Sequence, residues 1–168
     1  MFDGTRPKDL KIYTSPHGSF QVSLPSEFEI ATQEEHALVL KDASREDINA
    51  LIILTEFRPL DVTEDVVGAD QRFQYEETRS FWRNSLTDQK ILKEEAENFK
   101  GFPPTTLFLY IDQYNNYISS LVGATPEGNL FGISLGVPIL EDDAAFEKET
   151  SKYADIWGEG LDTLTFKE

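Results

Sequence analysis

The chain has 168 residues, 39% hydrophobic, 12% aromatic and 27% charged, and this size and composition predict one globular domain over residues 1–168. Its 31 acidic and 15 basic residues give a formal net charge of −16, which makes nucleic acid and anionic membrane surfaces poor partners and a basic protein a favourable one. The absence of cysteine excludes a disulfide framework, a thiol nucleophile and a cysteine-based zinc site.

The sequence carries no signal for insertion into a membrane. No apolar run approaches the ~20 residues that a membrane-spanning helix needs. The first residues, MFDGTRPKDLKIY, lack the apolar core of a signal peptide. We therefore expect a cytoplasmic protein, with a periplasmic or lipid-anchored protein as the alternative if a signal has been trimmed.

The first third of the chain is patterned as short β-strands. Phe20, Val22 and Leu24 alternate with polar residues, which indicates a half-buried strand. Residues 48–57, INALIILTEF, are almost continuously apolar and indicate a strand buried on both faces, although a helical segment has the same pattern. The expected strands are 10–14, 20–24, 28–32, 37–41 and 48–57.

A long helix is expected next, over residues 64–86. Asp61 or Thr63 can cap its start, and acidic residues follow in the first turn, where the helix dipole favours them. Residues 91–97 then form a strand or an irregular acidic stretch. The apolar stripe of the helix consists of Val66, Ala69, Phe73, Phe81 and Trp82.

Residues 101–138 form the centre of the predicted sheet. Leu107, Leu109 and Ile111 alternate with a second, largely apolar set, so this strand is expected to be covered on both faces. Thr125-Pro126-Glu127-Gly128-Asn129 indicates a hairpin turn, and Pro138 ends the returning strand. Asn115-Asn116 fits either a turn or a bulge.

A second helix is expected over residues 143–157. Asp142 or Asp143 would cap its start, and Gly158 and Gly160 would end it. Residues 161–166 are expected to dock as a tail. The expected inner stripe of the helix is Phe146, Glu149, Tyr153, Ile156 and Trp157, in which Glu149 is the misfit.

Strands and helices in separate blocks, joined by hairpins, predict an α+β domain: an antiparallel β-sheet flanked by two main helices. This order, with the phrases GSFQVSLPSEFEI, INALIILTEF, GFPP and TPEGNLFGISLGVP, resembles the PsbP-like family. That family includes the Ran-binding protein Mog, bacterial DcrB and chaperones of type VI secretion effectors. The resemblance implies a binding module without a catalytic motif or a cofactor.

Two patterns associated with enzymes have simpler structural explanations. Residues 132–136 match G-x-S-x-G, but they lie in an alternating strand, and no histidine follows Ser134 as the hydrolase order requires. His17 and His36 are the only histidines and are expected on the surface, too few for a zinc site. The acidic clusters lack the spacing of a calcium loop. We therefore expect no metal, and a hydrolase using Ser134 is our third hypothesis.

The candidate partner-binding residues are Tyr110, Tyr114 and Tyr117, which surround a polar stretch, because tyrosine is enriched at interface hot spots. Packing within the sheet is the alternative role for them, as it is for Trp82 and Trp157. The leading hypothesis is a non-catalytic bacterial accessory protein for a secreted toxin, either a chaperone or adaptor or an immunity protein. A homodimer is a further possible state of this protein. The alternative is an extracytoplasmic, lipoprotein-type or photosystem-associated domain.

Overall fold

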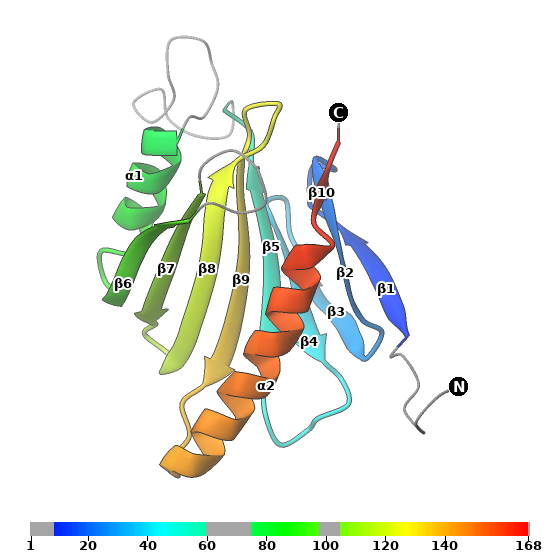
Figure 1. Ribbon diagram of the computed structural model, residues 1–168, viewed down its shortest axis with the longest axis vertical. Coiled ribbons are helices and arrows are strands. Elements are labelled where there is room, and N and C mark those ends of the chain that lie inside the picture. The colour runs from blue at the N-terminus through cyan, green and yellow to red at the C-terminus, as the bar shows by residue number, and fades with distance from the viewer. Residues whose placement is uncertain (1–8, 60–74, 98–104, 168) are drawn as a thin grey trace.

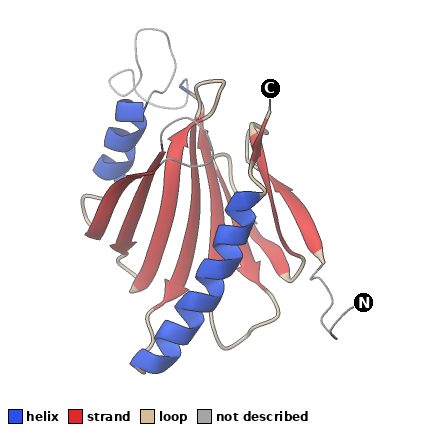
Figure 2. Cartoon of the chain, in the orientation of Figure 1, coloured by secondary structure: helices blue, strands red, loops and turns tan. Residues whose placement is uncertain are grey.

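The computed structural model describes residues 9–59, 75–97 and 105–167, and most of these lie in strands or helices (Figures 1 and 2). The strands are β1 (Leu10–Thr14), β2 (Phe20–Pro25), β3 (Phe28–Gln33), β4 (Ala37–Asp42), β5 (Leu51–Phe57), β6 (Lys90–Glu97), β7 (Thr105–Ile111), β8 (Asn116–Ala124), β9 (Leu130–Pro138) and β10 (Thr165–Phe166). The helices are α1 (Tyr75–Ser85) and α2 (Asp143–Asp162).

The strands form two antiparallel sheets, and together with the helices they confirm the α+β class. The larger sheet has seven strands in the order β3-β4-β5-β9-β8-β7-β6. The smaller sheet has the order β1-β2-β10, so the expected tail after α2 docks as a short third strand. The separation into two sheets was not visible in the sequence, because it depends on which strands pair and not on where strands occur.

The two helices lie on opposite faces of the seven-stranded sheet. Alternate residues of β9, such as Ile133 and Leu135, join the main core, against which α2 and β2 pack. Gly132, on the other face of β9, lies against Trp82 of α1, and a Cβ atom there would be 3.0 Å from the indole ring. The small residues of the G-x-S-x-G pattern thus allow close approach of a helix, as expected for an ordinary strand.

Helix α1 ends within one residue of the position that the sequence indicated, and the side chain of its Trp82 is buried as expected. The expected start of this helix, with Val66, Ala69 and Phe73, lies outside the described residues. The strand alternative for residues 91–97 is confirmed by β6. Arg79 and Arg83 of α1 both bond the carboxylate of Glu94, which fixes the helix to this edge strand.

Helix α2 is longer than predicted, because it continues through Gly158 and Gly160 to Asp162. Gly160 is needed for packing rather than for ending the helix, since a Cβ atom there would lie 2.7 Å from Leu24 Cδ2 of β2. The helix ends at Thr163, whose backbone N–H donates to the Gly160 carbonyl. Its predicted N-cap is confirmed, because Asp142 accepts a hydrogen bond from the Ala144 N–H.

Polar contacts hold α2 over the β4 side of the sheet. The misfit Glu149 forms an ion pair with Arg45 at 3.0 Å. The Tyr153 hydroxyl donates to the buried carboxylate of Asp42 at 2.6 Å. Burial raises the pKa of Tyr153, and its bond to the Asp42 carboxylate raises that pKa further. These contacts tie α2 to β4 and to the loop that follows it.

Strand β7 is not covered on both faces, contrary to the expectation from its sequence. Phe108 is fully buried on the α1 side, but Leu107, Leu109 and Ile111 on the opposite face are only half-buried. The physical reason is the position of α2, which packs chiefly on β9 and β2. Figure 1 shows α2 crossing β9, β5 and β4, while β6 and β7 lie clear of it.

Backbone geometry resolves the open question at Asn115-Asn116 and tests the predicted hairpin turn. Asn115 has φ 63° and lies in a tight turn closed by Asp112, while Asn116 begins β8, so this point of the chain is a turn and not a bulge. The turn at residues 125–129 forms as predicted, with Gly128 at φ 91°. Strand β5 begins at Leu51 rather than Ile48, and it is fully buried on one face only.

Candidate protein-binding groove beside helix α2

An apolar groove lies where α2 leaves the sheet uncovered. Its volume is about 470 Å³, and its floor includes Leu109 of β7, Tyr117 of β8 and Leu135 of β9. These residues share one face, because Leu109 is paired with Ser119, and Ser119 is paired with Leu135. The groove is therefore a consequence of the half-covered sheet, and we refer to it below as the α2 groove.

One wall of the α2 groove is the helix itself. Phe146, in the first turns of α2, packs edge-to-face with Tyr117 at a ring-centroid distance of 6.1 Å. Glu147 and Ser151 follow along the rim, and Ala154 lines the wall further along the helix. Both Phe146 and Tyr117 are half-buried, so their outer surfaces face the groove.

The groove offers apolar contact and few polar groups. The Thr150 hydroxyl already donates to the backbone carbonyls of the preceding turn. The backbone groups of the floor strands are used in the pairing of β7 with β8 and of β8 with β9. Among the described residues, no cluster of three or more histidine and acidic side chains could hold a metal ion. The arrangement is suited to burying an apolar surface.

The three candidate tyrosines occupy three different places. Tyr117 lines the α2 groove. Tyr110 lies on the α1 side of β7, where burial raises the pKa of its phenol despite a hydrogen bond with Ser120. Tyr114 is 76% exposed in the turn between β7 and β8. They do not form one surface, and only Tyr117 belongs to a concave site.

Ser134 lies inside β9, and not at a turn between a strand and a helix. Its side chain is buried, and its Oγ forms a hydrogen bond with the Ser120 Oγ at 2.7 Å. Both hydroxyls belong to neighbouring strands paired at this position. The structure therefore confirms that the G-x-S-x-G pattern belongs to an ordinary strand.

The two histidines meet in space, although the sequence indicated two separate surface positions. His17 Nε2 and His36 Nδ1 are 3.0 Å apart, and the His36 ring stacks on Phe57 with a centroid distance of 4.6 Å. His17 is in the β1–β2 turn and His36 precedes β4, so only the packing of the small sheet against the large one brings them together.

A buried carboxylate lies beside this histidine pair. Glu56 is fully buried and accepts hydrogen bonds from the Ser15 hydroxyl at 2.6 Å and the His17 backbone N–H at 3.0 Å. The Asn129 amide also donates to it, at 2.7 Å. Burial alone would raise the pKa of Glu56, but these hydrogen bonds, with one from Ser19, hold it below its ordinary value. No local pattern in the sequence distinguishes Glu56, because its hydrogen-bond donors come from distant parts of the chain.

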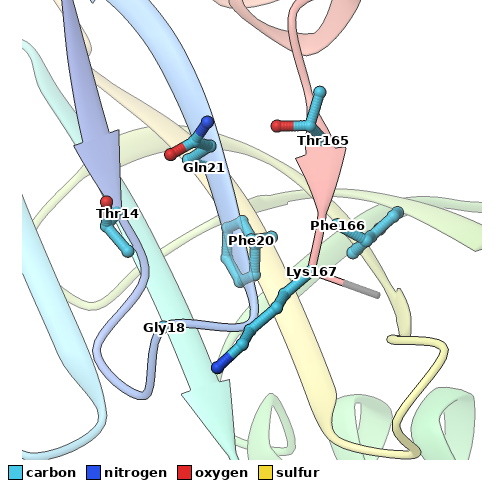
Figure 3. Close-up of a pocket in the computed structure, with 7 residues that line it drawn as sticks. All are labelled: Thr14, Gly18, Phe20, Gln21, Thr165, Phe166 and Lys167. Atoms are coloured by element: carbon cyan, nitrogen blue, oxygen red, sulfur yellow. The ribbon is translucent and has the colours of Figure 1, made fainter.

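A second, smaller pocket lies where β10 joins β2. It has a volume of about 260 Å³, and Gln21, Thr165 and Lys167 line it (Figure 3). Figure 3 shows the Lys167 side chain extending over the turn that contains Gly18. The backbone N–H of Lys167 donates to the Ser19 carbonyl, so this pocket marks the attachment of β10.

Comparison with known proteins reveals a structural likeness without a sequence match. No family model and no curated protein matches the chain. The solution structure of cyanobacterial PsbP (CyanoP) from Synechocystis sp. PCC 6803 superposes with a TM-score of 0.59 at 12% identity, over 99% of this chain and 98% of that one. The Ran-binding protein Mog1p of Saccharomyces cerevisiae superposes with a TM-score of 0.57 at 13% identity, over 95% of this chain and 96% of that one.

The chain has a PsbP/Mog1p-like fold. A crystal structure from Bacteroides thetaiotaomicron VPI-5482 is also similar, with a TM-score of 0.52 at 13% identity, and it covers 94% of this chain and 48% of that one. These matches confirm the PsbP-like part of the expected resemblance. The links to DcrB and to type VI secretion chaperones stay predictions.

In the described part of the chain, neither helix is both long and apolar enough to cross a membrane.

Proposed function

We propose that this protein is a non-catalytic protein-binding module and that the α2 groove is its contact surface. The single observation that carries the proposal is the half-buried apolar floor beside α2, which a folded chain leaves exposed only at some cost. The PsbP/Mog1p-like fold supports it, since Mog1p of Saccharomyces cerevisiae, which has this fold, is a Ran-binding protein.

The finer proposal is an accessory role for a secreted toxin such as a type VI secretion effector, in the bacterial cytoplasm. As a chaperone or adaptor, the protein would cover an apolar segment of the toxin. As an immunity protein, it would use its net charge of −16 to meet a basic toxin. Both roles act by occlusion, and neither requires a reaction at the groove.

Capture of the partner at two salt concentrations tests this proposal. Tagged protein is incubated with lysate of the source organism, the retained protein is identified, and the complex is rebuilt from purified components. We expect one stoichiometric partner, and we expect Ala154→Arg in the groove wall to weaken the complex while Glu127→Lys in the β8–β9 turn leaves it unchanged. Loss of the partner at high salt favours the immunity role, and retention favours the chaperone role.

A complex that is insensitive to Ala154→Arg would overturn the assignment of the groove. Failure to retain any partner at either salt concentration would count against the accessory role itself. In both cases, the thermal midpoint of each variant is measured first, so that unfolding is not mistaken for loss of binding.

A second candidate is an extracytoplasmic or photosystem-associated PsbP-like domain. The likeness to cyanobacterial PsbP, which extends over 99% of this chain, favours it. The two candidates differ in what the gene encodes ahead of the domain. A signal segment followed by a lipid-anchored cysteine would support the second candidate and exclude the cytoplasmic one.

A further inference from the structure

We propose that the α2 groove binds an amphipathic α-helix with a basic flank, and the proposal rests on the protein-binding function above. The apolar face of this helix would cover the floor formed by Leu109, Tyr117 and Leu135. Its basic residues would meet the acidic rim of α2. Two observations carry the proposal. The backbone N–H and C=O groups around the groove are already hydrogen-bonded, and the exposed charges of α2 beside the groove are acidic.

The backbone around the groove determines the secondary structure of the ligand. Strands β7 and β8 are each paired on both sides, and β9 is paired with β8 and β5, so their N–H and C=O groups are occupied. The wall is α2, whose backbone groups are bonded within the helix. A segment lying in the groove finds no backbone partner there and must satisfy its own, which a helix does.

The sheet edge nearest the groove does not provide an alternative site. The edge strand is β6, beyond β7, and a strand added to it would extend the sheet instead of filling the groove. A register shift between Ile91 and Lys93 also interrupts the pairing of β6, which is a common protection of an edge. The groove and this edge are therefore separate surfaces.

The charges beside the groove determine the sign of the flank. Asp143 and Glu147 lie one turn apart on α2, and both are exposed. No basic side chain in the described part of the chain forms an ion pair with either of them. Lys152 of α2 lines a small pocket with Asp42, on the other side of the helix.

The β6 side does not balance this negative charge. Lys93 shares the groove face with Leu109, but its ammonium group is 2.6 Å from the Glu95 carboxylate. The rim of α2 thus keeps its negative charge within a molecule of net charge −16. A basic flank gains from this field in the speed and specificity of association.

Binding of three designed peptides of about 18 residues, or five helical turns, tests the inference. The first places leucine at helical spacing with lysine elsewhere, the second replaces each lysine with glutamate, and the third has the composition of the first in strict alternation. Isothermal titration calorimetry gives the affinities, and circular dichroism gives the helix content. We expect the leucine–lysine helix to bind at least about tenfold more tightly than either control peptide.

Groove variants show where the peptide binds. Glu147→Lys on the rim and Ala154→Arg in the wall should each weaken binding of the leucine–lysine helix about tenfold. Glu127→Lys makes the same charge change in the β8–β9 turn and should leave the affinity unchanged. Both groove positions are exposed, so these variants should fold, and thermal melting checks that they do.

Equal binding of the glutamate helix, equal binding of the alternating peptide, absence of binding, or insensitivity to both groove variants would each overturn the inference. An apolar dye that binds the groove and is not displaced by the leucine–lysine helix would indicate a small apolar ligand instead, and would also overturn it. Suppose that a natural partner is captured through the groove but the helical peptide does not bind. The proposed protein-binding function would then stand, and only the inference that the ligand is a helix would be refuted.

Discussion

The carboxylate of Glu56 accepts a hydrogen bond from the side-chain amide of Asn129 at 2.7 Å, although the two residues are 73 positions apart in the sequence. Glu56 lies in β5, while Asn129 immediately precedes β9. The same carboxylate accepts from the β1–β2 turn through Ser15 and His17. One buried acid therefore joins the turn of the small sheet to two strands of the large one.

Replacing Glu56 with glutamine should destabilise the protein by about 2 kcal/mol, because an NH₂ group would then face donors and leave buried hydrogen bonds unmade. Urea unfolding followed by circular dichroism measures the difference. Glu127→Gln, which removes an exposed carboxylate, serves as the control and should change the free energy of unfolding very little. A Glu56→Gln variant as stable as the wild type would show that the network contributes nothing net.

The pKa of Glu56 lies below its ordinary value of 4.5, and this has a consequence for stability at low pH. A carboxyl group with a lowered pKa in the folded state stabilises the protein fully above pH 4.5, and this contribution is lost as the pH falls toward the folded pKa. Glu94 acts in the same direction, since its bonds to Arg83 and Arg79 lower its pKa to about 2.

Unfolding midpoints in urea, measured from about pH 7 to about pH 3, should therefore fall below pH 4.5 in the wild type, and the fall should be smaller in Glu56→Gln. Equal slopes for the two proteins would contradict the lowered pKa. Glu127→Gln is again the matched control and should keep the wild-type slope.

Two glycines of α2 should respond to alanine in opposite directions. At Gly160, the new methyl group would lie 2.7 Å from Leu24 Cδ2, and Leu24 is itself buried, so Gly160→Ala should cost about 1–3 kcal/mol. At Gly158, nothing lies within 4 Å, and alanine should stabilise the helix by about 0.5–1 kcal/mol. Thermal melting of both variants measures these changes in stability. A destabilised Gly158→Ala together with a neutral Gly160→Ala would refute the packing argument.

Tyr153→Phe should destabilise the protein by about 1–3 kcal/mol, because the buried Asp42 carboxylate would lose the hydroxyl that donates to it at 2.6 Å. Tyr114→Phe removes an exposed hydroxyl and is the matched control, expected within about 0.5 kcal/mol of the wild type. Chemical unfolding of both variants measures the difference. Equal stabilities would mean that Asp42 is satisfied by Ser44 alone.

Local patterns in the sequence predicted the elements that depend on neighbouring residues. The alternation of Phe20, Val22 and Leu24 predicted a half-buried strand, and all three side chains are buried in β2. Asp142 was one of two candidate caps, and it forms the cap. Gly128 was expected to supply a positive φ in the hairpin turn, and it does. Each of these features is determined within a few residues.

The features that position the candidate site depend on distant residues and were not predictable in this way. The half-open face of β7 results from where α2 rests, and α2 is bonded there to Arg45 and Asp42, which are distant in sequence. Glu56 looked like one polar residue at the end of an apolar strand, but its donors come from elsewhere in the chain. The expected end of α2 at Gly158 was wrong, because the helix continues to Asp162 and buries Gly160 and Leu161 against distant parts of the chain.

The attachment of β10 to β2 has a consequence for the order of synthesis. The backbone N–H of Ser23 bonds the hydroxyl of Thr163, 140 positions later in the chain. On the ribosome, the hairpin of β1 and β2 therefore emerges well before the strand and the helix that cover it. Val22 and Leu24 cannot gain the cover of α2 until the last part of the chain is made, which prolongs the stage at which β2 is prone to aggregation.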